Sequence, residues 1–375
     1  IADDSALSRR VLSRLIDSDS GMKIVGEAHN GKAAIVEAER LQVDIILMDV
    51  VMPLMDGLNA TREVMRTAPR PIVIVSDLVG READLNFKAL EAGAIDLLRK
   101  PSADDLDDPL FARRFVRNIK ALAAVPVIRR YRPAQDPAVR SVKSTRAATR
   151  TAPASAPASR SGVWPELAMA GVAAPIFIGA STGGPPALSM LLRELDGRIS
   201  APIVVVQHMT QGFMAGMAAW LANQLNHTRV QLVDESTRLE PATAYLAPDD
   251  AHLKFERSWL VTSALPSGTR HMPSVDVLFE SVARDACAGR STAVLLTGMG
   301  SDGARGLLAI KEAGGHTIAQ DETSSVVYGM PRAAIEMGAA REILSIGDIA
   351  NRLGERFGAR PAGAVVTGMR TDAKA

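Results

Sequence analysis

Short apolar runs alternate along the chain with longer stretches in which apolar side chains recur every three or four positions. Near the N-terminus, Leu7, Val11 and Leu15 recur at the spacing of one helix face. Most of the short runs are apolar throughout, as expected for strands buried on both faces of a parallel sheet. In residues 1–125 the pattern therefore predicts a βα repeat, with helices near 31–41, 57–67, 82–92 and 108–125 and strands at 24–26, 45–48, 72–75 and 95–98.

Residues 173–358 repeat this alternation with a β-rich interruption. Apolar strand runs lie at 176–178, 203–206 and 293–296. Between the last two, residues 245–247, 252–255 and 259–262 carry the pattern of an antiparallel ribbon. We therefore predict a second α/β domain, with a doubly wound, mostly parallel sheet and an antiparallel edge ribbon.

The two patterned regions are joined by a segment of different composition. Residues 126–172 are rich in Ala, Pro, Ser and Arg and have no apolar period. Such a segment cannot bury enough apolar surface to offset its chain entropy, so we predict a flexible linker, and a second disordered tail at 359–375. The arginines of the linker could contact an acidic partner or nucleic acid. A solvated tether is favoured because no aromatic platform accompanies these charges. The chain opens at Ile1 on the end of a strand, so the first strand is expected to be truncated.

Composition narrows the function classes. The 375 residues are 47% hydrophobic, which is ample for two or three packed domains, and the formal net charge of +1 argues against a dedicated nucleic-acid binder. The lone cysteine, Cys287, rules out an internal disulfide and suits a reducing compartment. The longest uncharged apolar run, 167–180, is too short to cross a bilayer and contains Pro175. We therefore expect a cytoplasmic protein without membrane insertion.

One stretch predicts a reactive serine. The strand run 176–178 leads into Gly179-Ala180-Ser181-Thr182-Gly183, and prolines then open a helix. A glycine-flanked serine between strand and helix is typical of a nucleophile on a sharp turn, with the helix N-terminus behind it for a developing oxyanion. A phosphate-cradling loop of a nucleotide-binding unit has the same glycines, so this stretch alone leaves both hypotheses open.

The residues at two further strand ends favour the hypothesis that Ser181 is a nucleophile over a phosphate-binding loop. His208 follows the run 203–206, and Asp302 follows the run 293–296, so Ser181, His208 and Asp302 are expected at one edge of one sheet. A serine hydroxyl needs an imidazole to accept its proton and a carboxylate to orient that imidazole. For Asp302 the alternative is an N-cap of the helix at 304–312, and we expect both roles. His271 could line a substrate cleft, although a surface or capping role is favoured.

Carboxylates also gather at the strand ends of the first domain. Asp3, Asp4 and Asp49 follow strands, while Ser76 and Lys100 follow two others. Converging carboxylates repel one another, and hard oxygen ligands suit Mg²⁺. A carboxylate beside that metal, with a lysine and a hydroxyl nearby, can accept a phosphoryl group. A purely structural carboxylate cluster is the alternative.

These residues resemble the receiver domain of two-component response regulators, a flavodoxin-like fold with a parallel five-stranded sheet. The matching words are Ala2-Asp3-Asp4-Ser5, 47–57 around Asp49, and Arg99-Lys100-Pro101. The resemblance implies Mg²⁺ as cofactor and Asp49 as phosphoacceptor. It further implies Asp3, Asp4 and the Val51 carbonyl as metal ligands, with Ser76 and Lys100 as switch residues. Leu97 stands where many receivers carry an aromatic switch residue.

The whole chain resembles the chemotaxis protein-glutamate methylesterases, in which a receiver is linked to a serine-hydrolase domain. The matching words are 178–184, 206–209, 273–279, 297–303, 319–322 and 329–331. By position, Ser181 resembles the nucleophile, His208 the base and Asp302 the orienting acid, with Thr182 and Met299 on the oxyanion side. Ser301 replaces an asparagine that many members carry before the catalytic aspartate.

The resemblance implies an enzyme that removes methyl groups from glutamate methyl esters of chemoreceptors, deamidates receptor glutamines, and needs no cofactor for the esterase reaction. Methyl-accepting chemoreceptors would be substrates, and a chemotaxis histidine kinase the phosphodonor of Asp49. The unphosphorylated receiver would cover the Ser181 edge. The main rival is a phospho-switched binding module without chemistry. A transcriptional regulator is disfavoured because no basic recognition helix follows the receiver.

Overall fold

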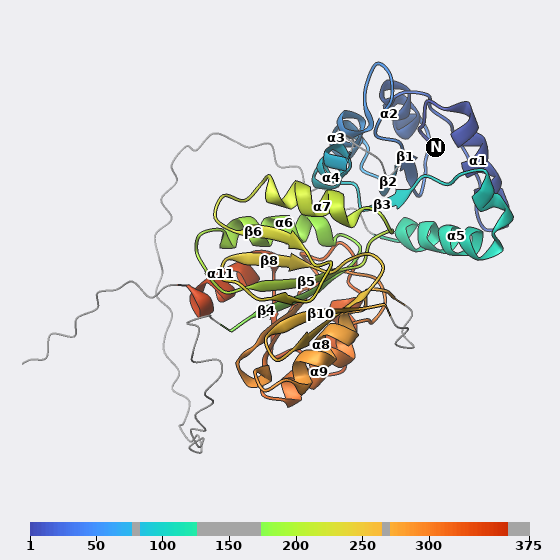
Figure 1. The fold of residues 1–375 in the computed structure, drawn as a ribbon. Coiled ribbons are helices and arrows are strands. Elements are labelled where there is room, and N and C mark those ends of the chain that lie inside the picture. The colour runs from blue at the N-terminus through green and yellow to red at the C-terminus, as the bar shows by residue number, and fades with distance from the viewer. Residues whose placement is uncertain (77–82, 126–173, 265–270, 359–375) are drawn as a thin grey trace, which may run out of the picture.

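The computed structural model describes residues 1–76, 83–125, 174–264 and 271–358, so the predicted linker and C-terminal tail lie outside the described residues. The described chain forms two α/β units (Figure 1). The N-terminal unit, blue to cyan, lies beside helices α6 and α7 of the C-terminal unit. No helix of the described residues is long and apolar enough to cross a membrane.

The N-terminal unit confirms the predicted βα repeat. Its parallel sheet has the order β1-β2-β3, and the isolated parallel bridges of Ala2 to Ala28 and to Met48 extend it on the side of β1. The elements are α1 (Ala6–Asp17), α2 (Gly31–Arg40), β1 (Ile46–Met48), α3 (Gly57–Thr67), β2 (Ile72–Ser76), α4 (Ala83–Glu91), β3 (Asp96–Arg99), the 3₁₀ turn η1 (Asp104–Asp107) and α5 (Pro109–Ala123).

Two of the five expected strands are reduced to bridges. Residues 24–26 form no strand in the described structure, and the neighbouring Ala28 is bridged to Ala2 instead. The chain start is joined to this segment by backbone hydrogen bonds: the Ile1 ammonium donates to the Gly26 carbonyl at 3.0 Å, the Ala28 N–H to the Ile1 carbonyl, and the Asp3 N–H to the Ala28 carbonyl. The strand order across the sheet is nevertheless that of a five-stranded receiver.

The C-terminal unit is built on a seven-stranded sheet of order β13-β12-β11-β4-β5-β8-β6, and every neighbouring pair in it is parallel. Its face with Val205 packs against α6, α7 and α11, and the face with Val204 and Val206 packs against α8, α9 and α10. The elements are β4 (Ile176–Ala180), α6 (Gly184–Leu195), β5 (Ile203–Gln207), α7 (Met214–Ala222), β6 (Arg229–Leu232), β7 (Thr237–Arg238), β8 (Thr243–Leu246), β9 (His252–Glu256), β10 (Trp259–Ser263), α8 (Val275–Arg284), η2 (Ala288–Arg290), β11 (Thr292–Leu295), α9 (Ala304–Glu312), β12 (His316–Gln320), α10 (Met330–Glu336), β13 (Glu342–Leu344) and α11 (Ile346–Phe357).

The antiparallel ribbon differs from the expectation. The prediction that residues 245–247 belong to it is wrong, because β8 pairs in parallel with β5 inside the main sheet. Strands β9 and β10 do pair antiparallel, but with β7 they form a separate three-stranded sheet. Tyr245 explains the difference: its ring is fully buried and its hydroxyl donates to the Arg238 carbonyl, so β8 is a core strand beneath the ribbon.

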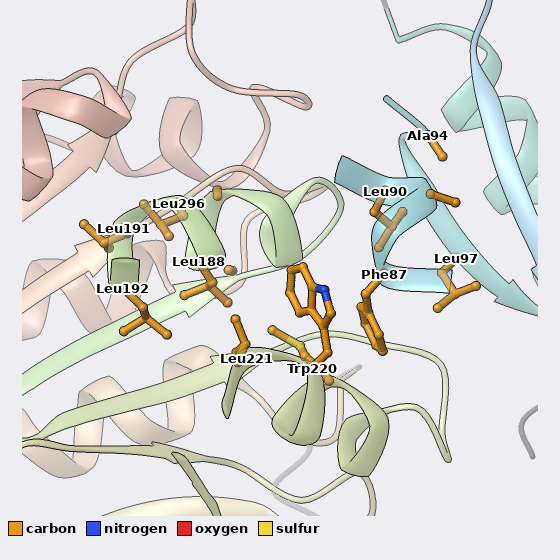
Figure 2. Close-up of a cluster of buried hydrophobic side chains, with 14 of the residues drawn as sticks. Phe87, Leu90, Ala94, Leu97, Leu188, Leu191, Leu192, Trp220, Leu221 and Leu296 are labelled. Carbon is orange, nitrogen blue, oxygen red and sulfur yellow. The ribbon is translucent and has the colours of Figure 1, made fainter. Parts of the chain in front are cut away.

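The two units share a continuous apolar cluster. Phe87 of α4 stacks on Trp220 of α7, with ring centroids 5.1 Å apart and planes 23° from parallel. Figure 2 shows these rings side by side, with Leu90 and Leu97 of the N-terminal unit behind Phe87 and Leu188 and other leucines on the far side of Trp220. Burying large apolar side chains in this way stabilises the packed arrangement of the two units.

Candidate active site

The candidate nucleophile Ser181 lies on a sharp turn between β4 and α6. Gly183 has φ +75°, and a Cβ at this position would come within 2.4 Å of Val326, so both the backbone conformation and the space require glycine. The N–H of Ser181 donates to the Thr297 carbonyl at 3.0 Å. The local sequence thus holds a half-buried serine at the carboxyl end of a central strand, as predicted.

His208 and Asp302 meet as the sequence predicted. His208 Nε2 lies 2.8 Å from Asp302 Oδ2, and both side chains are largely buried. Burial acts to raise the pKa of Asp302, but the hydrogen bond and charge of His208, together with the Val275 N–H and the Ser274 hydroxyl, lower it to about 2. The carboxylate is therefore held in its charged form, as an orienting acid must be.

Asp302 does cap a helix, but not the expected one. The N-cap of α9 is Gly303, without a side-chain bond. Instead, Asp302 accepts from the N–H of Val275 at 2.7 Å and of Asp276 at 3.1 Å, at the N-terminus of α8. The prediction of an α9 cap is wrong because α8 brings its N-terminus to the same sheet edge. Those backbone donors and the helix dipole favour a charged carboxylate.

The second ring nitrogen of His208 remains available for another hydrogen bond. Its Nδ1 atom is buried and has no hydrogen-bond partner in the described chain. Ala180 and Gln207 are paired across β4 and β5, so Ser181 and His208 occupy adjacent positions just beyond that pair. The His208 N–H also donates to the Ala180 carbonyl at 2.9 Å. With Nε2 bound to Asp302, Nδ1 is the nitrogen available to the Ser181 hydroxyl, although no hydrogen bond joins them in this arrangement.

His271 lies against the base. Its ring stacks on His208, with centroids 4.5 Å apart and planes 9° from parallel. Sequence reasoning considered a cleft-lining role but favoured a surface role. The residue is exposed as expected, yet it also covers one face of the His208 imidazole. The word Arg270-His271-Met272-Pro273 contains no pattern that would have predicted this contact.

Thr182 and Gly298, the residue before Met299, lie next to Ser181. The Thr182 carbonyl accepts from the Thr297 hydroxyl at 2.9 Å, which fixes the turn. Met299 follows Gly298, where a Cβ would come within 2.7 Å of the Ser181 Cβ. Gly298 therefore packs against Ser181.

The receiver's acidic residues also converge. Ligand atoms of Asp3, Asp4 and Asp49 all lie within 4.8 Å of one another. Lys100 Nζ is 2.8 Å from Asp49 Oδ2 and 3.0 Å from Asp3 Oδ2. Burial raises the pKa of Asp49 to about 6, against the lowering effect of Lys100. Three carboxylates with a single lysine leave excess negative charge, and this donor set fits a small divalent cation such as Mg²⁺.

The remaining receiver residues lie at the same edge. Val51 is exposed, and its N–H reaches Asp49 Oδ1 at 3.4 Å. Ser76 is buried at the end of β2, and its carbonyl accepts from the Lys100 N–H at 2.8 Å. All the sequence-predicted receiver residues are therefore neighbours of Asp49 or Lys100.

Asp96 joins the N-terminal unit to the Ser181 turn, and the sequence did not predict it. Its Oδ2 accepts from the Thr182 hydroxyl at 2.9 Å, one residue from the nucleophile. Burial raises the pKa of Asp96 to about 6, against hydrogen bonds from Leu97 and Thr182 that lower it. The next carbonyl, of Leu97, accepts from Thr210 at 3.5 Å, two residues beyond His208. The sequence did contain a signal for a specific polar contact here, because Asp96 interrupts the otherwise apolar run 95–98.

The fold and these sites define a class of protein: a receiver-type domain packed against an α/β domain that carries a serine, a histidine and an aspartate at the carboxyl ends of its parallel strands. Comparison with known families agrees. A family model described as CheB methylesterase matches residues 176–353, and one described as response regulator receiver domain matches residues 1–109. The chain belongs to the CheB methylesterase family.

Its relatives match over nearly their whole length. Protein-glutamate methylesterase/protein-glutamine glutaminase 4 of Myxococcus xanthus is 40% identical, over 95% of this chain and 96% of the relative. Protein-glutamate methylesterase/protein-glutamine glutaminase 1 of Syntrophus aciditrophicus is 39% identical, over 92% and 93%. The crystal structure of the Thermotoga maritima CheB methylesterase catalytic domain is 34% identical, with a TM-score of 0.46, and covers 49% of this chain and 98% of that chain.

Proposed function

We propose that the chain is a phosphorylation-activated hydrolase that removes methyl groups from glutamate methyl esters of chemoreceptors and deamidates receptor glutamines. The observation that carries this proposal is the His208–Asp302 pair at 2.8 Å, on the strand end next to Ser181. Full-length relatives named for this activity support the substrate class. The lone cysteine, buried Cys287, suits a reducing cytoplasm as the site of action.

In the proposed reaction, the Ser181 Oγ attacks the carbonyl carbon of the glutamyl ester while His208 Nδ1 takes the hydroxyl proton. Asp302 holds Nε2–H and stabilises the imidazolium that forms. The tetrahedral intermediate collapses as His208 returns the proton to the departing methoxide, releasing methanol. Water, deprotonated by His208, then cleaves the acyl-enzyme. With a glutamine substrate only the leaving group changes, from methanol to ammonia.

Backbone N–H groups of Thr182 and Met299 are the proposed oxyanion donors. Thr182 follows Ser181 in the chain, and Met299 follows Gly298, which packs against Ser181. Helix α6 begins at Gly184, so its N-terminal dipole also favours negative charge there. Thr182 is only 6% exposed because the receiver covers it. A substrate carbonyl therefore has access to this side only when the receiver moves away.

Asp49 is the proposed phosphoacceptor, supplied by a chemotaxis histidine kinase. Asp3, Asp4, Asp49 and the Val51 carbonyl would hold Mg²⁺, which when bound neutralises charge on the transferring phosphoryl group. Lys100, already within 2.8 Å of Asp49, would pair with the phosphoryl oxygens, and Ser76 would donate to one of them. Losing its Asp49 partner shifts Lys100 at the end of β3, the strand that carries Asp96 and Leu97.

Unphosphorylated receiver is proposed to inhibit by covering the site. Asp96 binds Thr182, Leu97 binds Thr210, and Phe87 stacks on Trp220, so the receiver occupies the space above the nucleophile edge. A long helical receptor substrate cannot reach Ser181 past this packing. Phosphorylation at Asp49 would weaken these contacts and expose the site.

The test is methanol release from methylated receptor membranes, measured with and without a small-molecule phosphodonor and Mg²⁺. We expect release by the full chain to rise with phosphodonor, and to lose that rise when Mg²⁺ is chelated. A chain that forms phospho-Asp49 yet releases no methanol contradicts the proposed activity.

A further inference from the structure

Gln207 ends strand β5, immediately before His208, and its side chain is 1% exposed. It lies against the first turn of α6, where a Cβ at Gly184 would approach its Oε1 to 2.0 Å. A long polar side chain at this depth must be bound by specific partners.

Its amide nitrogen binds the backbone of both proposed reacting residues. Gln207 Nε2 donates to the Ser181 carbonyl at 2.8 Å and to the His208 carbonyl at 2.7 Å. The Ser181 carbonyl also accepts from the Gly184 N–H at 2.7 Å. One buried amide therefore links the turn that carries the nucleophile to the segment that carries the base.

The amide oxygen of the same side chain makes an unfavourable contribution to stability. Gln207 Oε1 is buried and has no hydrogen-bond partner in the described residues. An unpaired buried acceptor destabilises a fold, whereas a methionine of similar length and volume would fill the space without one. Both hydrogen bonds that Gln207 does make go to the active-site backbone, so stability alone does not explain a glutamine here.

We propose that Gln207 is a positioning residue that fixes the separation of Ser181 and His208. This inference rests on the proposed function, because it concerns the alignment of His208 Nδ1 with the Ser181 hydroxyl. Small misplacements of reacting groups cost large factors in rate while leaving substrate binding intact. Without the amide link, the turn and the base segment are joined only through strand pairing and move apart more readily.

The test compares Q207M with wild type in the full chain. We expect kcat for methanol release, with phosphodonor present, to fall by about 10- to 100-fold, with KM within about twofold, and the urea midpoint of unfolding to be unchanged or higher. Labelling of Ser181 by a fluorophosphonate probe should slow by a similar factor. The matched control is T317V, which removes the buried Thr317 hydroxyl bond to the Ala339 carbonyl (2.7 Å) at the amino end of β12. It should lower stability and leave kcat unchanged.

A Q207M variant with wild-type kcat and labelling rate overturns the positioning role. A kcat loss that matches a fall in stability and appears equally in T317V also overturns it, because the effect is then structural. Fluorophosphonate labelling does not require the receptor substrate. If wild type releases no methanol but Q207M still slows labelling, the proposed substrate is wrong and the positioning role stands.

Discussion

Asp302 and Asp49 are buried carboxylates at the carboxyl edges of two parallel sheets, and their surroundings act on them in opposite directions. Asp302 accepts hydrogen bonds from His208, Ser274 and two backbone N–H groups, and its pKa is lowered to about 2. Burial raises the pKa of Asp49 to about 6, although Lys100 lies 2.8 Å away. Asp302 accepts from four donors, whereas Asp49 accepts only from Lys100 and, at 3.4 Å, from the Val51 N–H in the described residues.

This difference in hydrogen bonding and pKa matches the different roles proposed for the two carboxylates. A carboxylate that orients a catalytic histidine must keep its charge and position through every step, so the fold supplies its partners in advance. A phosphoacceptor must change state, and its incomplete neutralisation leaves binding energy for a cation and a phosphoryl group. The catalytic edge is thus preorganised, and the receiver edge is poised to be altered by ligands.

The largest expected effect is at Asp302. D302N should lower kcat by about 10³- to 10⁴-fold, because asparagine cannot stabilise the His208 imidazolium and favours the wrong tautomer. The measurement is methanol release with phosphodonor present. The control D196N removes another carboxylate that accepts several backbone N–H bonds, beyond the C-terminal end of α6, and should leave kcat unchanged. Equal kcat values for D302N and wild type would remove Asp302 from the mechanism.

The next effect is at Asp49. D49N should abolish stimulation by phosphodonor, which we expect to be about 5- to 150-fold in wild type, as is typical of coupling between sites. The basal rate should stay near that of the unphosphorylated chain, because the catalytic edge is complete without the receiver's charge. A D49N variant that responds fully to phosphodonor would show that another residue accepts the phosphoryl group.

A smaller effect tests the contact between the two sites. D96A removes the acceptor for the Thr182 hydroxyl, a bond whose loss should cost roughly 1 kcal/mol, or about fivefold in the balance between closed and open arrangements. The unphosphorylated basal rate should rise by about that factor. D96N keeps an amide oxygen that can accept the same bond and should remain repressed. A D96A rate equal to or below wild type argues against inhibition through this contact.

The smallest effect is on stability, and its pH dependence has opposite signs at the two carboxylates. The pKa of Asp49 is raised from 3.8 to about 6, so the folded state binds more protons in that window and loses stability as pH rises through it. Without divalent cations, D49N should therefore be more stable than wild type at pH 7, with the gap closing as pH falls from about 6 to about 4.

The pKa of Asp302 is lowered to about 2, so its charged form stabilises the fold above about pH 4, and this contribution is lost as pH falls toward 2. D302N should therefore be less stable than wild type at pH 7, and the deficit should shrink only below about pH 4. Urea unfolding followed by hydrogen exchange in β1 and β11 resolves the two domains. Two variants that are both more stable, or both less stable, than wild type at pH 7 would contradict the contrast drawn between the sites.

Much of this arrangement was predictable from the sequence, because the residues directly after parallel strands gather at one edge of the sheet. That rule brings Ser181, His208 and Asp302 together, and likewise Asp49 and Lys100. It could not assign the helix that Asp302 caps, since the N-terminus of α8 arrives from another part of the chain. Nor could it place β8, whose apolar pattern suits a ribbon strand and a core strand equally.

The residues that sequence reasoning missed act through tertiary contacts. Asp96 interrupts an apolar strand, a visible signal, but its partner Thr182 lies in the other domain. Gln207 has the pattern of an ordinary strand end, and only the geometry shows its amide between two carbonyls. His271 stacks on His208 although the two residues are far apart in the chain, and hydrophobic periodicity does not predict such long-range contacts.

The central claim is that Ser181 forms the acyl-enzyme, and the most direct measurement is methanol release from methylated receptor membranes by S181A and wild type, both with phosphodonor. The proposed mechanism predicts that S181A loses about 10⁴-fold or more in turnover while its receiver still accepts phosphate at Asp49. Methanol release by S181A at a rate near that of wild type would contradict it.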